Sequence, residues 1–102
     1  YGPNYGFCPH GSGRKGIQWA KDVNDAEFIE RAVSMDAGGL LVKAEENMSA
    51  CGPGATAALV AAMSELGVEK GVMLGHTNSS DIMIKKYGRT SDDSVGYAGI
   101  VF

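Results

Sequence analysis

The sequence predicts a layered α/β domain, and three observations support this class. Three segments in the first two thirds of the chain have helical spacing or helix-forming composition. Two later segments, residues 70–76 and 94–102, are apolar runs typical of strands. A hydrophobic content of 44% over 102 residues allows one small domain with a modest core. We therefore expect helices that pack on a sheet.

Residues 1–22 predict mostly loop, because glycine and proline recur through them. A first helix is expected to start at Asn24, which can cap it, with Glu27 three residues later in the capping-box position. The apolar face of this helix then consists of Phe28, Ile29, Ala32 and Val33.

Two further helices are expected after the first. Asp36 can cap a helix that extends to about Asn47. The third helix has Pro53 in its first turn and Gly67 as its stop signal. Residues 55–66 form helices readily, and their nearly continuous apolar surface predicts burial on several sides.

The C-terminal third predicts two strands separated by a loop. Residues 70–76 form the first strand, and the polar residues 77–93 predict a long surface loop. Residues 94–102 leave little room for a polar face, so we expect this strand to be central in a sheet. Because no helix is expected between the two strands, they can be antiparallel neighbours.

Charge and cysteine content restrict the class of protein. A net charge of -3, from 9 basic and 12 acidic residues, argues against a nucleic-acid or anionic-membrane partner. No apolar run is long enough to span a bilayer. Cys8 and Cys51 have neither CxxC nor zinc-finger spacing, so we expect reduced thiols in a cytoplasmic protein, with one disulfide as the alternative. Because the chain opens at Tyr1 with a glycine-rich, aromatic stretch, we expect the C-terminal piece of a longer polypeptide.

Cys51 is the first candidate for chemistry. It precedes Gly-Pro-Gly and a helix, where the positive end of the helix dipole favours the thiolate. Thiolate is the form that binds metals and attacks electrophiles, and the neighbouring glycines allow close approach of a ligand. The alternative is a small buried core residue beside a tight turn.

The two histidines are the next candidates. His76 lies at the end of a strand, where α/β folds place functional groups, and it can be a ligand or a proton carrier. The alternative is a half-buried histidine held by nearby polar side chains. His10 and Cys8 lie two residues apart, but two ligands are too few for a metal site. The GxGxxG match at residues 11–16 does not follow a predicted strand, so a flexible loop is the better interpretation.

Four stretches of the chain form an ordered set that ends at the last residue. They are YGPNYGF from Tyr1, ACGPGATAALVAAMSELG from Ala50, HTNSSDIM from His76 and SVGYAGIVF from Ser94. Together they resemble the C-terminal part of the Memo-like family, which includes AmmeMemoRadiSam system protein B. That family lies in the class III extradiol ring-cleavage dioxygenase (LigB) superfamily. By this resemblance, residues 1–102 are the C-terminal part of a single Memo/LigB-like α/β domain.

The resemblance implies a mixed central sheet flanked by helices. Enzymatic members of the superfamily use non-haem Fe(II) to bind a catechol and O2 together. In Memo-like proteins the cysteine of the CG pair lies at the metal pocket, and that role falls on Cys51 here. The implied cofactor is Fe(II) or another divalent or copper ion. His76 stands where many relatives carry an aromatic residue, so it is retained as a candidate catalytic residue of the pocket and not as a ligand.

The other metal-pocket histidines of the family lie upstream, and one is expected immediately before the YG of this chain. A single thiolate cannot form an iron site with open positions. We therefore expect this chain to need the upstream half of the domain, or to self-associate. A small aromatic compound or a peptide is the expected ligand.

Two main functions remain open. The first is the C-terminal portion of a dioxygenase-type oxidoreductase with a metal or ligand pocket near Cys51. The alternative is a non-catalytic Memo-type binding or scaffold module. A third interpretation, a hydrolase with a cysteine nucleophile, would need His10 or His76 as its base.

Overall fold

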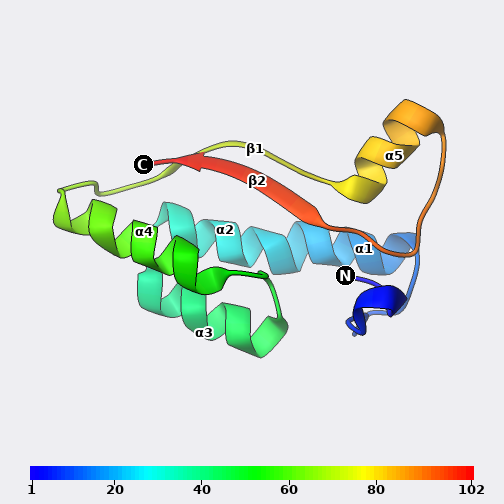
Figure 1. Cartoon of the computed structure of the whole chain (residues 1–102), viewed down its shortest axis with the longest axis horizontal. Coiled ribbons are helices and arrows are strands. Elements are labelled where there is room, and N and C mark those ends of the chain that lie inside the picture. Colours follow the sequence, from blue (N-terminus) through cyan, green and yellow to red (C-terminus); the bar gives the residue numbers. More distant parts are fainter.

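The computed structural model describes residues 1–102 and confirms the α/β class. Two strands run alongside one long helical rod, with α3 and α4 packed at the α2 end of that rod and α5 at the far end of the strands (Figure 1). In chain order the elements are η1 (Pro3–Tyr5), α1 (Arg14–Trp19), η2 (Ala20–Asp25), α2 (Ala26–Val33), α3 (Ala37–Asn47), α4 (Pro53–Glu65), β1 (Val72–Asn78), α5 (Ser79–Tyr87) and β2 (Gly96–Val101).

The first helix begins earlier than predicted. The expected loop over residues 1–22 is wrong from Arg14 onward, where α1, the π-helical turn η2 and α2 form one continuous rod. Gly16 is a turn signal in the sequence, but it lies inside α1. A Cβ atom at this position would overlap the carbonyl oxygen of Gly11 and the side chain of Tyr1. The glycine therefore serves close packing, which composition alone does not reveal.

The predicted cap at Asn24 is also wrong. Asn24 lies within the rod, in η2, and its side chain is buried. Its Nδ2 donates a hydrogen bond to the carbonyl oxygen of Asn47, 3.0 Å away. The amide thus joins the rod to the end of α3, and does not cap a helix.

The start of α3 follows the prediction. Asp36 is the N-cap, and its Oδ1 accepts a hydrogen bond of 2.9 Å from the backbone N–H of Gly39. Its Oδ2 accepts a hydrogen bond of 2.9 Å from Arg31. The Gly39 amide and then the Arg31 guanidinium hold the pKa of Asp36 below its ordinary value, because both stabilise the carboxylate. The helix ends at Asn47, as predicted.

Helix α4 has the predicted start and stop but not the predicted burial. Pro53 is its first residue, and a Schellman motif ends it, with Gly67 N–H bonded to Ser64 O and Val68 N–H bonded to Met63 O. Only two of its residues are buried, because α3 and, to a smaller extent, α2 cover one side of it. The expectation of burial on several sides is therefore wrong for this chain.

Strands β1 and β2 form a two-stranded antiparallel sheet, which confirms that they are neighbours. His76 lies opposite Ala98, and Asn78 lies opposite Gly96. The register shifts between Met73 and Gly75. Strand β2 has one hydrogen-bonded neighbour and is mostly exposed, so it is not the central strand that its apolar sequence predicts.

The predicted loop over residues 77–93 is wrong, because it contains α5. The side chain of Asn78 caps this helix, with its Oδ1 accepting a 2.7 Å hydrogen bond from the backbone N–H of Asp81. Gly88 ends the helix in the left-handed conformation, after two lysines in the last turn. These are ordinary start and stop signals, and the polar composition of the segment concealed them.

The core lies where α2, α3 and α4 meet. Its fully packed members are Ala32, Leu40, Ala57 and Val60. Side chains from β2 reach the same cluster, including Ile100 and, just beyond the strand, Phe102. None of the helices combines the length and the apolar character needed to cross a membrane.

Candidate functional site

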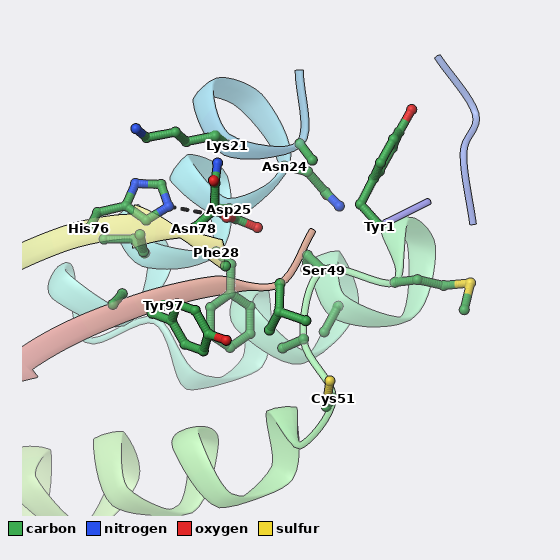
Figure 2. Close-up of a pocket in the computed structure, with 18 of the residues that line it drawn as sticks. Tyr1, Lys21, Asn24, Asp25, Phe28, Ser49, Cys51, His76, Asn78 and Tyr97 are labelled. Carbon is green, nitrogen blue, oxygen red and sulfur yellow. Dashed lines mark hydrogen bonds and ion pairs between the residues drawn. The ribbon is translucent and has the colours of Figure 1, made fainter. Parts of the chain in front are cut away.

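A cavity of about 890 Å³ lies between the rod, the segment that follows α3, and strand β2 (Figure 2). Most of its lining is hydrophobic, with 17 of 27 residues of that kind, so a ligand would leave water for a largely apolar site. The aromatic members of the lining are Tyr1, Tyr5, Phe7, Phe28, Tyr97 and Phe102. The cavity has the size and the aromatic character of a small-molecule site.

The π-helical turn η2 supplies the polar wall of this cavity. Four of its six residues line the cavity, namely Ala20, Lys21, Asn24 and Asp25. Because i→i+5 bonding widens the turn, residues four and five apart face the same side. Such turns inside α-helices occur often at functional sites. No pattern in the sequence marks this turn.

Asp25 and His76 form the central polar pair of the site. Nε2 of His76, from β1, lies 3.1 Å from Oδ2 of Asp25. The two side chains are only 14% and 22% exposed, so the pair is well shielded from water. Burial raises the pKa of Asp25 above its ordinary value, although the hydrogen bond and charge of His76 and the N-terminal ammonium oppose the rise.

Two other polar side chains near this pair, those of Lys21 and Asn78, already have partners. Lys21 forms an ion pair of 2.5 Å with Asp81, at the start of α5. Asn78 is buried and uses its side-chain oxygen to cap α5. These contacts fix β1 and α5 against the rod, and so hold His76 in place.

Two buried polar atoms of the lining have no hydrogen-bond partner: Oδ1 of Asn24 and Oγ of Ser49. The amide nitrogen of Asn24 is bonded to Asn47, so the orientation of the amide is fixed. Unpaired buried polar atoms are uncommon in folded proteins and often occur at functional sites.

Cys51 lies at the opposite side of the cavity from His76. It is an exposed, free thiol on the segment that leads into α4, and its sulfur is directed toward the cavity (Figure 2). The structure therefore brings both predicted site residues to one cavity, without placing them in contact. Cys8 is also free and exposed, but it does not line the cavity. His10 packs on Trp19, with ring centroids 4.0 Å apart.

Sequence reasoning missed Asp25 and Asn24 as site residues. Both precede an apolar run, so their polarity was attributed to a helix start. His76 was identified, but its partner lies 51 residues away in the chain. A contact over that separation leaves no local pattern.

The chain by itself does not supply a metal site. Its residues contain no group of three or more His, Cys, Asp or Glu side chains placed to hold one ion. Cys51 is a suitable soft donor, and His76 is already bonded to Asp25 through one ring nitrogen. An ion at Cys51 would need donors from outside these 102 residues.

The sequence is similar to curated proteins of one family. A MEMO1 family protein of Methanopyrus kandleri is 37% identical over 79 residues, which cover 76% of this chain and 26% of that protein. MEMO1 family proteins of Nitrosopumilus maritimus and Thermoplasma volcanium are 39% and 37% identical, over 76% of this chain and 27% of their own lengths. The chain is Memo-like.

This Memo-like chain spans about a quarter of the length of the curated relatives it matches. No protein-family model matches its sequence, and no solved structure matches it significantly. The comparisons thus confirm the resemblance to the Memo-like family.

Proposed function

We propose that this Memo-like chain forms one side of a pocket that binds a small hydroxylated aromatic compound. The complete cytoplasmic protein would be an oxidoreductase related to the class III extradiol dioxygenases of the LigB superfamily. The observation that supports this proposal is the single cavity that collects aromatic walls, the Asp25–His76 pair and the thiol of Cys51.

The cavity suits such a ligand on physical grounds. Aromatic walls favour a flat ring through apolar burial and offset or edge-to-face contacts. A shielded acid–base pair at one end can accept a proton from a ring hydroxyl or return a proton to its oxygen. A peptide would also fit the volume, but the shielded pair favours a compact ligand with one polar end.

We further propose that the upstream half of the domain completes the site. The curated relatives are about four times as long as the matched region, so they contain further chain that could supply the rest of the site. In the complete site Cys51 would be the residue of this chain that holds the metal, Fe(II) or another divalent or copper ion. Thiolate suits copper or zinc better than an oxygen-activating iron centre.

Binding of catechol to the purified chain, followed by NMR, tests the pocket. We expect chemical-shift changes that saturate with added catechol and are centred on η2, β1 and Tyr97. Changes spread over the surface without saturation would contradict the proposal.

Metal uptake tests the role of Cys51, and the two free cysteines provide a matched comparison. Native mass spectrometry of the protein from its own source, without chelator, should show a larger complex with a bound metal ion. Cys51→Ser should lower metal content in that complex, whereas Cys8→Ser, outside the cavity, should not. Equal metal content in both variants would rule out Cys51 as a ligand.

A non-catalytic binding module is the second candidate. The observation that favours it is the donor set, since one thiol with no adjacent ligand group is poorly matched to oxygen activation. The two candidates differ in oxygen consumption. Catechol binding by the complete metal-loaded protein without oxygen uptake would support the binding module.

A further inference from the structure

The orientation of the Asp25–His76 pair shows which member can meet a ligand. His76 uses Nε2 to contact Oδ2 of Asp25. Its other ring nitrogen lies on the side of the ring remote from Asp25 and from the cavity (Figure 2). The second carboxylate oxygen of Asp25, Oδ1, points away from His76 and into the cavity (Figure 2). Both side chains line the cavity, but His76 turns its Nε2 toward Asp25, whereas Asp25 keeps one oxygen free.

Oδ1 of Asp25 is free to accept a hydrogen bond. The one side-chain hydrogen bond of Asp25 is made by Oδ2. Oδ1 has no protein donor, and it is not fully sealed from solvent. Next to it in the chain, Asn24 is 4% exposed and its own Oδ1 has no partner. Oδ1 of Asp25 and Oδ1 of Asn24 are thus two acceptors at this wall of the cavity that have no donor from the protein.

The charges around Asp25 favour a neutral donor over a cationic one. The imidazole of His76 contacts Asp25 through Oδ2. Lys21, one helical turn away, is paired with Asp81. A ligand cation would meet the ammonium of Lys21, which also lines the cavity, whereas a neutral hydroxyl would not be repelled. Burial raises the pKa of Asp25, although His76 contacts one of its two oxygens.

We propose that Asp25 is the ligand-contacting residue of the pair, accepting a hydrogen bond from a ring hydroxyl of the bound aromatic compound, with His76 as a positioning residue. This inference rests on the proposed function, and it moves the ligand contact from His76, the candidate that the sequence indicates, to Asp25, which the sequence does not mark as a site residue. A carboxylate in a shielded site makes a stronger hydrogen bond than a neutral acceptor does. His76 holds Oδ2, and so fixes the direction of Oδ1.

The test compares catechol with 1,2-dimethoxybenzene, which has the same ring but no hydroxyl donors. NMR titrations use the wild-type chain and the variants Asp25→Asn, His76→Ala, His76→Gln and Asp22→Asn. The last is the matched control, since Asp22 is an exposed carboxylate on the same helical turn and lies outside the cavity. Thermal melting by circular dichroism verifies that each variant folds.

We expect Asp25→Asn to weaken catechol binding by about tenfold, the difference between a charged and a neutral hydrogen bond. Binding of dimethoxybenzene should not change, and Asp22→Asn should behave as wild type. His76→Ala should weaken catechol binding, and His76→Gln should restore part of it, because its amide can still donate to Oδ2. Catechol should also lower the pKa of the Asp25 carboxyl in the wild-type chain, and this can be followed by its carbon-13 resonance even if a variant does not fold.

Two results would overturn the inference, and they differ in whether the proposed function survives. Catechol binding that depends on His76 but not on Asp25, and is not rescued by His76→Gln, would make His76 the ligand contact and leave the proposed function intact. No catechol binding by the wild-type chain would overturn the proposed function together with this inference.

Discussion

The carboxylate of Asp25 occupies the space that a side chain on Gly96 would fill. A Cβ atom on Gly96 would overlap Oδ2 of Asp25, the atom that contacts His76. The Asp25 side chain can therefore lie this close to strand β2 because residue 96 is glycine. The same close approach shields the Asp25–His76 pair and gives the cavity its polar end.

Gly96→Ala should displace Asp25 and disturb its pair with His76. Overpacking of this kind costs about 1–3 kcal/mol in the free energy of unfolding. Gly99→Ala on the same strand is the control, because no atom lies within 4 Å of a Cβ at that position. Urea unfolding should show a change within about 0.5 kcal/mol for the control. Equal stability of the two variants would contradict the close approach.

The stability of the protein should depend on the ionisation of Asp25. Its pKa in the folded state is raised from an ordinary value of 3.8. At pH values between 3.8 and the raised pKa, the folded state therefore binds more protons than the unfolded state. Wild type should therefore lose stability relative to Asp25→Asn as pH rises from 3.8 through the raised pKa. Thermal melts from about pH 3 to about pH 7 measure this difference. A wild type that instead gains stability over this range would mean that the His76 contact outweighs burial.

Asn78→Ala should destabilise α5. It removes the side chain that caps the helix, at a cost of about 1 kcal/mol, and the site is nearly inaccessible to water that could replace it. Asn78→Ser keeps a capping oxygen and should retain most of the stability. Hydrogen exchange of the α5 amides reports the change locally. Unchanged protection of α5 in Asn78→Ala would show that the cap is not needed.

Leu40→Ala should lower the free energy of unfolding by about 2–5 kcal/mol, because Leu40 is fully buried in the core between the helices. Leu66→Ala removes the same atoms from a side chain that is 77% exposed, and should change stability by less than about 0.5 kcal/mol. Urea unfolding of both variants gives the comparison. Similar losses at the two positions would place the core elsewhere.

The sequence by itself determined the elements whose signals are local. Asp36, Pro53 and Gly67 mark helix ends by side-chain and backbone chemistry that acts within one turn, and the structure has those ends. The apolar runs became strands, and the ordered motifs predicted the Memo-like family that the comparisons confirm.

Only the tertiary structure decided the site. The π-helical turn has no sequence pattern, and its polar residues resemble a helix start in the sequence. The pairing of Asp25 with His76 joins residues 51 positions apart, and the Asp25 carboxylate occupies space that Gly96 leaves free. Such contacts depend on how elements pack in three dimensions, so residue types and spacing identify Cys51 and His76 but not the carboxylate that lines the cavity beside His76.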